Sequence, residues 1–172
     1  MKTMKIAAAA LALTMLAGPL FAVPPAPVEK LTSTGPDGKP GAILKGAIVP
    51  PGYDTFYLSG QLADPIDPAK KATVEDFGDT KTQTISTLTK IKALLEEKGY
   101  KLSDVVKMTA FLAADPKLGK MDFKGYMEGF LQFFNTAENP STVARSTVMV
   151  AALVQPMYLV ELEVTAVKPA KK

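Results

Sequence analysis

The 172-residue chain contains no histidine, no cysteine and no tryptophan, and only one of its 20 basic residues is an arginine, Arg145. The missing histidine and cysteine exclude a Ser-His-Asp triad, a thiol nucleophile and a zinc site of the usual type. The sequence also lacks a P-loop and a G-x-G-x-x-G motif. Any catalysis must therefore use carboxylates, lysines, hydroxyl groups, Arg145, main-chain amides and water.

Residues 1–22 have the layout of a secretory signal peptide. Lys2 and Lys5 precede an apolar run from Ile6 to Ala17, and the segment ends on a small residue, Ala22. The run is short for a membrane anchor, although an uncleaved tether is the alternative. The predicted signal indicates a periplasmic or secreted protein that leaves the membrane after cleavage. Because the chain has no cysteine, it forms no disulfides, so its stability must come from its core and its assembly.

Opposite charges are interspersed along the rest of the chain. The formal net charge of +3 becomes +1 when Lys2 and Lys5 leave with the signal. No part of the mature chain forms a basic stripe, so we expect no nucleic-acid partner.

Proline and glycine divide the mature chain. We expect three parts: a flexible Pro/Gly-rich lead over residues 23–40 with one short extended piece at 29–33, a single domain over residues 41–168, and a C-terminal tail over residues 169–172.

Apolar residues at helical spacing predict two helices. The first runs from Asp79 to Gly99, with Thr and Lys on its outer face and an inward stripe of Ile85, Leu88, Ile91 and Leu95. The second covers residues 122–134 and carries an aromatic stripe that we assign to the core.

Five β-rich runs are predicted as strands, over residues 42–49, 53–58, 105–112, 141–150 and 157–167. Pro50-Pro51-Gly52 separates the first two, which we expect to pair as a hairpin. The order β-β-α-β-α-β-β predicts an α+β fold, a mixed sheet with two helices on one face. Residues 147–152 carry no charge on either face. Both faces are therefore expected to be buried, one against the helices and one against another subunit.

The single arginine is informative because of its shape. A guanidinium is a planar fork that grips a carboxylate with two parallel hydrogen bonds, which a lysine ammonium cannot do. From the sequence alone, Arg145 is either an anchor for a ligand carboxylate or half of a structural ion pair.

Five blocks of the chain resemble, in the right order, segments of the RidA (YjgF) family of enamine/imine deaminases. Residues 56–62 resemble its F-V-S-G-Q-I strand, and residues 91–99 its N-I-K-A-I-L-E-A-A-G helix. The other three blocks are residues 102–112, 144–148 and 160–167, which resemble L-D-D-V-V-K-V-T-V-F-L, P-A-R-S-C-V and V-E-I-E-V-I-A-V.

The resemblance implies a chorismate-mutase-like subunit in a homotrimer, with ligand clefts between subunits. It also implies hydrolysis of reactive 2-imino or enamine acids to 2-keto acids and ammonia, without a cofactor. The expected ligand is then a small imine or keto acid that bears a carboxylate.

The resemblance assigns roles to six residues. Arg145 would clamp the substrate carboxylate, with the Thr147 amide as a second contact, and Glu161 would position and deprotonate water. Glu163 lies two residues further along the same strand face and is the second candidate for the carboxylate. Ser59 and Gly60 would border the cleft through their main chain, or simply form a turn. For Glu161 the alternative is a paired or rim-exposed carboxylate.

Three positions depart from the family pattern by replacing polar residues with apolar ones. Leu44 and Phe130 stand where the family has tyrosines, and Met127 stands where it has an asparagine. These changes favour one of two interpretations. The enzyme acts on a substrate with a larger apolar side chain, or the protein has no catalytic activity and binds small carboxylates or a protein partner.

Overall fold

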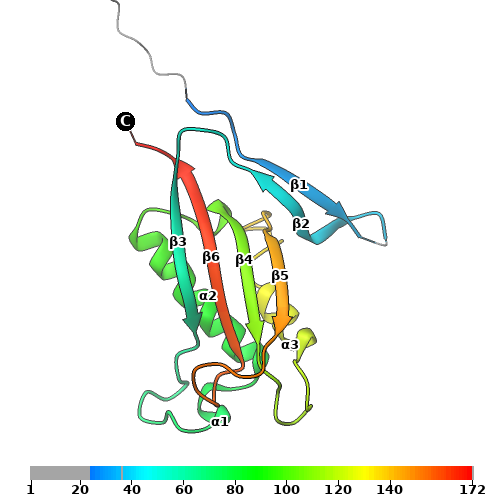
Figure 1. The fold of residues 1–172 in the computed structure, drawn as a ribbon, viewed down its shortest axis with the longest axis vertical. Helices are drawn as coiled ribbons and strands as arrows, with labels where there is room; N and C mark the ends of the chain where they lie inside the picture. The colour runs from blue at the N-terminus through cyan, green and yellow to red at the C-terminus, as the bar shows by residue number, and fades with distance from the viewer. Residues whose placement is uncertain (1–23, 36, 172) are drawn as a thin grey trace, which may run out of the picture.

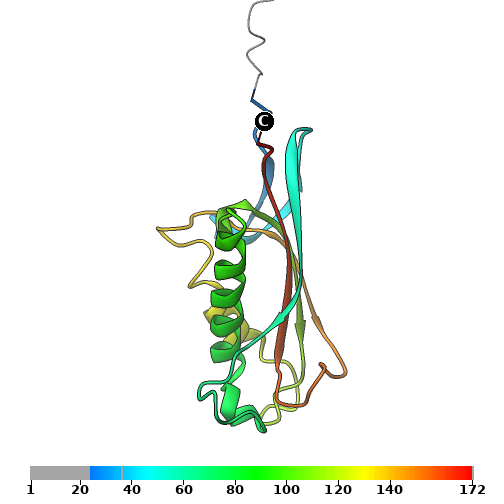
Figure 2. The ribbon, with the colours of Figure 1, turned by 90° about the vertical axis from the view of Figure 1, so that its left-hand side faces the viewer.

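The fold has two layers, a six-stranded mixed sheet and a layer of helices on one of its faces (Figures 1 and 2). It is taken from a computed structural model that describes residues 24–35 and 37–171. The strands are β1 (Glu29–Thr34), β2 (Pro40–Ile48), β3 (Tyr53–Leu62), β4 (Val105–Leu112), β5 (Ala144–Met149) and β6 (Val160–Pro169). The helices are α1 (Val74–Phe77), α2 (Thr80–Glu97), α3 (Phe123–Phe130) and the 3-10 turn η1 (Leu102–Asp104). The α+β class is confirmed, and the predicted signal peptide lies outside the described residues.

Helix α2 begins and ends where the sequence predicts. The Asp79 carboxylate accepts a hydrogen bond from the Thr82 amide at the N-terminus, and Gly99 takes a positive φ of 71° after the last turn. Leu88, Ile91 and Leu95 are fully buried.

The expectation that threonines face outward from α2 holds for Thr89, which is exposed, but is wrong for Thr80, Thr84 and Thr87. Gln83, Thr84 and Thr87 are all buried, because α2 packs on α3 as well as on the sheet. A Cβ on Gly129 of α3 would lie 2.8 Å from the Thr84 Cβ, so the two helices approach closely only because this residue is a glycine.

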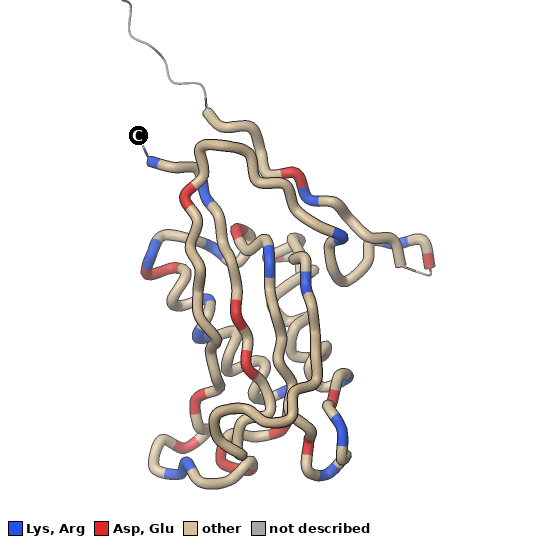
Figure 3. Tube along the Cα trace, in the orientation of Figure 1, with Lys and Arg blue, Asp and Glu red and all other residues tan. Residues whose placement is uncertain are grey.

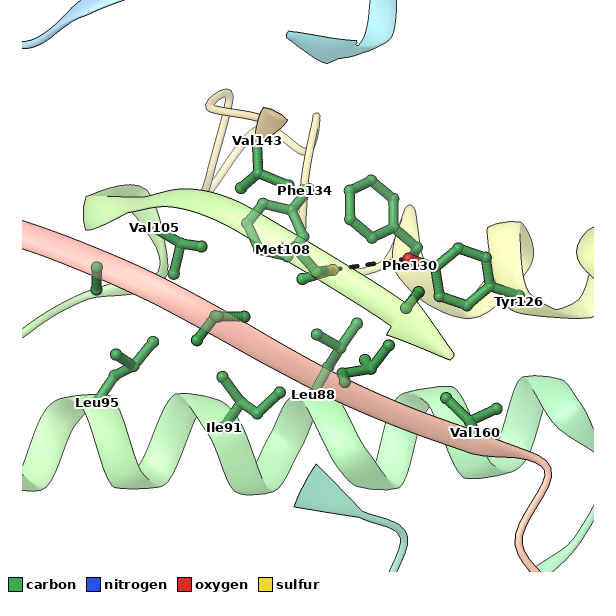
Figure 4. Close-up of a cluster of buried hydrophobic side chains, with 14 of the residues drawn as sticks. Leu88, Ile91, Leu95, Val105, Met108, Tyr126, Phe130, Phe134, Val143 and Val160 are labelled. Carbon is green, nitrogen blue, oxygen red and sulfur yellow. Dashed lines mark hydrogen bonds between the residues drawn. The ribbon is translucent and has the colours of Figure 1, made fainter. Parts of the chain in front are cut away.

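The aromatic stripe of the second helix lies mostly in the core, as expected. Tyr126, Phe130 and Phe134 are fully buried, and the last two rings stack with centroids 4.8 Å apart (Figure 4). Phe123 is an exception, because its side chain is 44% exposed. The regular helix also ends at Phe130, four residues earlier than predicted, and continues as a turn.

The hairpin predicted between residues 42–49 and 53–58, which are β2 and β3 in the structure, does not form. In the sheet order β1-β2-β5-β4-β6-β3, strand β2 pairs with β1 and β5, whereas β3 pairs along its length with β6. The extended piece expected within the lead is strand β1. Residues 29–34 of the lead therefore belong to the sheet. Pro50-Pro51-Gly52 therefore carries the chain from one side of the sheet to the other (Figure 1).

The second face of the sheet, away from the helices, is uncovered in the single chain. We call it the open face. Along β6, Leu162 and Val164 point toward the helices and are buried, whereas Glu161 and Glu163 alternate onto the open face. On β5, Val148 is 42% exposed, so the burial predicted for both faces of this strand is not achieved within one chain. Among the described residues, no helix has the length and apolar character needed to cross a membrane.

Candidate functional site

The Arg145 side chain lies between strand β5 and helix α3. Its neighbour across the ladder is Met108 of β4, which is fully buried on the helix side of the sheet. The guanidinium carbon lies 4.4 Å from the ring centroid of Phe130 and 5.0 Å from that of Tyr126. The Nη2 atom lies 3.1 Å from the Met127 sulfur. Aromatic faces and a thioether therefore hold this cation by cation–π and dispersion contacts.

This guanidinium has no anionic partner within the described part of the chain. None of the ion pairs there includes Arg145, and its buried Nη1 atom has no hydrogen-bond partner. Burial raises the pKa of Tyr126 to about 12, although the Arg145 charge acts in the opposite direction, so the phenol is neutral at physiological pH. The structural ion pair that the sequence left open is thus not formed here, and the buried Nη1 group keeps its hydrogen-bonding capacity unused within the described chain.

The main chain of β5 adds donors beside Arg145. The Val143 carbonyl accepts from the Leu44 amide of β2, whereas the Val150 amide donates to Leu112 of β4. Because main-chain groups of alternate residues point to the same side of a strand, those of Thr147 point away from β4. Strand β2 pairs with β5 only at Leu44 and Ala144, so the Thr147 amide lies on an unpaired stretch of this edge within the described chain.

Glu161 and Glu163 lie on the open face, as their spacing predicts. Glu161 is opposite Leu62 of β3 and Phe111 of β4, and Glu163 is opposite Thr109. Within the described residues neither carboxylate forms an ion pair.

Ser59 and Gly60 form the irregularity in the β3–β6 ladder directly beside Glu161. The register shifts between Leu58 and Gln61, and a Cβ on Gly60 would overlap the Glu161 carboxylate. A larger residue at position 60 would therefore have to displace the Glu161 carboxylate, whereas sequence reasoning assigned Gly60 only as a cleft border or a turn.

One chain does not bring all the predicted site residues together. Arg145 and Thr147 lie on the helix side and outer edge of β5, whereas Glu161 and Gly60 lie on the open face. The sheet itself separates the two groups. A single substrate can contact both groups only where two chains meet.

The three departures from the family pattern fall around Arg145. Leu44 is buried and lies beside Ala144, Met127 contacts the guanidinium, and Phe130 lies beneath it. Sequence reasoning missed Tyr126 as a neighbour of Arg145. Its spacing of four residues from Phe130 places both rings on one helix face and could have indicated it.

A cleft of about 720 Å³ lies elsewhere, between the end of α2 and the loop after α3. Tyr100, Leu102 and Phe133 contribute apolar side chains to it, and its polar groups include neither Arg145 nor Glu161. We therefore do not place the candidate site there.

Comparison with known proteins identifies the family of this chain. The family model described as Endoribonuclease L-PSP matches residues 50–168. A RutC family protein from Pyrococcus horikoshii is 37% identical over 113 residues, which cover 66% of this chain and 79% of that protein. The 2-iminobutanoate/2-iminopropanoate deaminase of Salmonella typhimurium is 34% identical over 110 residues, which cover 64% of this chain and 77% of the deaminase.

Solved structures show the same fold. The YjgF gene product of Escherichia coli superposes with a TM-score of 0.52 at 31% identity, over 66% of this chain and 80% of that one. A Rid family protein of unknown function from Yersinia pestis gives a TM-score of 0.57 at 22% identity, over 73% and 86% of the two chains, and supports the fold alone. The fold is thus chorismate-mutase-like, and the chain belongs to the RidA/YjgF family.

Proposed function

We propose that this protein is an exported, homotrimeric deaminase that hydrolyses reactive 2-imino or enamine acids to 2-keto acids and ammonia. The observation that carries the proposal is the Arg145 guanidinium, which is partly buried among Tyr126, Met127 and Phe130 without an anionic partner in the described chain. The name of the Salmonella relative, 2-iminobutanoate/2-iminopropanoate deaminase, gives a matching chemistry.

A 2-imino acid carries a carboxylate next to its electrophilic C=N carbon. In the proposed mechanism Arg145 grips the carboxylate with two hydrogen bonds, the Thr147 amide adds a third, and the carbon is held in a fixed orientation. Glu161 accepts a proton from a water molecule as its oxygen bonds to this carbon. The nitrogen takes up a proton, the resulting carbinolamine collapses, and ammonia leaves as the C=O bond forms. Each of these steps proceeds without a cofactor.

The separation of the two groups by the sheet supports an assembly of more than one chain, which we propose to be the homotrimer. If the open face of one subunit covers the β5–α3 edge of the next, Glu161 of one chain and Arg145 of its neighbour line the same cleft. The exposed open-face side chains Tyr57 (78%) and Val148 (42%) support such a contact, because apolar surface gains stability by leaving water.

The test is ammonia release from 2-imino acids generated in place by an amino-acid oxidase. Replacing Arg145 by alanine removes a bidentate, partly desolvated clamp and is expected to lower kcat/KM by about 30- to 1,000-fold. Arg145→Lys keeps the charge but loses the fork, so we expect it to rescue only part of the activity. Equal rates for Arg145→Ala and the wild type would refute the proposal.

The assignment of the carboxylate has a matched pair of variants. Glu161→Gln removes the proposed base and is expected to lower kcat with little change in KM, whereas Glu163→Gln on the same face is expected to keep most of the activity. The reverse result would transfer the role to Glu163.

A second candidate function is supported by Leu44, Met127 and Phe130, which surround Arg145 with apolar groups. In this alternative the clefts bind small carboxylates, or the surface binds a protein, without catalysis. Calorimetry with 2-ketobutyrate, pyruvate and benzoate separates the two functions, because binding without turnover of any imino acid favours the alternative. Export is tested separately by the N-terminal mass of the protein recovered from the periplasm.

A further inference from the structure

We propose that the substrates of this site are 2-imino acids with bulky apolar side chains, and that Met127 is the residue that selects them. The inference rests on the proposed function, because it concerns the same Arg145 site. It is carried by an apolar stripe on α3 that runs past the unpaired guanidinium.

The stripe consists of Phe123, Met127 and Leu131, which are spaced four residues apart and so lie along one side of the helix. Phe123 is 44% exposed and Leu131 is 45% exposed, although each is a large apolar side chain. Met127, between them, is partly buried and contacts the Arg145 Nη2 atom through its sulfur. The side of α3 that carries Phe123, Met127 and Leu131, next to the Arg145 guanidinium, is therefore apolar over two helical turns.

Charge and polarity together define the ligand. Arg145 supplies a single positive charge without an anionic partner in the described chain, and it lies against the rings of Tyr126 and Phe130 and the Met127 thioether. The one hydroxyl among these neighbours, that of Tyr126, is fully buried and donates to the Met108 sulfur in the core. A molecule that fits both features has one carboxylate and an apolar tail of several carbon atoms. A methyl tail, as in 2-iminopropanoate, leaves most of the stripe in water.

Met127 is the residue best placed to contact the substrate's apolar side chain, because it belongs to the stripe and also contacts the Arg145 guanidinium. Phe130 and Tyr126 are fully buried beneath the guanidinium, so they orient the clamp and do not face the ligand tail. An asparagine at position 127 would place an amide beside the guanidinium and would favour small or polar tails.

The first measurement uses the unmodified protein and the 2-keto acid products as ligands in calorimetry. We expect 4-methyl-2-oxopentanoate and phenylpyruvate to bind at least about tenfold more tightly than pyruvate, since each buried methylene in an apolar site contributes a factor of this order. 2-Oxoglutarate is a polar control of similar size and is expected to bind no better than pyruvate. Equal or weaker binding of the two apolar acids overturns the inference.

The second measurement compares variants in the coupled ammonia assay and in calorimetry. Met127→Asn is expected to reduce the preference for apolar over small acids by about tenfold or more. Met127→Leu keeps an apolar side chain and is expected to retain the preference. Leu118→Asn, a matched change of an exposed apolar residue in the loop after β4, is expected to leave the preference unchanged. An unchanged preference in folded Met127→Asn refutes the role of Met127.

These measurements separate the two proposals. Turnover that is fastest for 2-iminopropanoate, with no gain from apolar tails, refutes this inference and leaves the deaminase function intact. A clear binding preference for apolar keto acids without turnover of any imino acid supports this inference and counts against the deaminase function.

Discussion

Gly60 leaves space that the Glu161 side chain occupies. A Cβ at position 60 would overlap the carboxylate of Glu161 and would lie 2.8 Å from its carboxyl carbon. The Gly60→Ala variant must therefore displace the far end of a flexible side chain and not the main chain. Because a displacement of about 1 Å at a catalytic group costs on the order of 100-fold in rate, we expect Gly60→Ala to lower kcat by roughly that factor.

Stability distinguishes this effect from simple unfolding. The glutamate can rotate away, so we expect the unfolding free energy of Gly60→Ala to change by no more than about 1 kcal/mol, as measured by urea denaturation. Gly46→Ala in β2 is the matched control, because its new Cβ would meet only Leu31 at an ordinary 3.7 Å. Full activity in Gly60→Ala would show that the position of the Glu161 carboxylate is not important.

At the scale of elements, Gln83 joins helix α2 to the segment that enters β6. Its fully buried amide donates to the carbonyls of Gly78 and Met157, at 3.1 and 2.9 Å, and accepts from the Leu159 amide at 2.8 Å. Gln83→Leu would leave the Leu159 N–H buried and unsatisfied, so we expect a loss of about 2 kcal/mol in the free energy of unfolding.

The matched control for Gln83 is Gln132→Leu, since that exposed amide makes one hydrogen bond of 3.3 Å to Glu128. We expect Gln132→Leu to change stability by less than about 0.5 kcal/mol in the same urea titration. If the two variants were equally stable, the buried network of Gln83 would contribute nothing measurable.

The elements also show what a sequence can and cannot reveal. Asp79 and Gly99 carry local signals for the two ends of α2, so this helix was predictable from its own residues. The pairing of β3 with β6 joins residues about 100 or more positions apart, and no local pattern near Pro50-Pro51-Gly52 encodes it. The burial of Thr84 in α2 was missed for a similar reason, because it depends on the close approach of Gly129 from another helix.

At the scale of the whole molecule, the sequence indicates which residues are candidates for the site but not how they are arranged. Arg145 and Glu161 are both odd-numbered strand residues, yet they project from opposite sides of the sheet. Alternation fixes faces within a strand, whereas the relation between two strands depends on the register of the ladder. The proposed active site further depends on a second chain, which no property of one sequence can place.

The assembly leads to a prediction about Val148, which lies beside Phe111 on the open face. If open faces pack in a homotrimer, symmetry places three copies of each substitution in the interface, and a lysine there would bury a charge without a partner. We expect Val148→Lys to dissociate the trimer into monomers in size-exclusion chromatography with light scattering.

Activity should be lost together with the trimer, because a monomer holds Arg145 and Glu161 on opposite sides of its sheet. Val154→Lys provides the control, since this 68% exposed residue belongs to the loop between β5 and β6 and not to the sheet. It is expected to remain trimeric and active. A monomeric wild type that deaminates imino acids, or a trimeric Val148→Lys variant, would show that the open face does not complete the site.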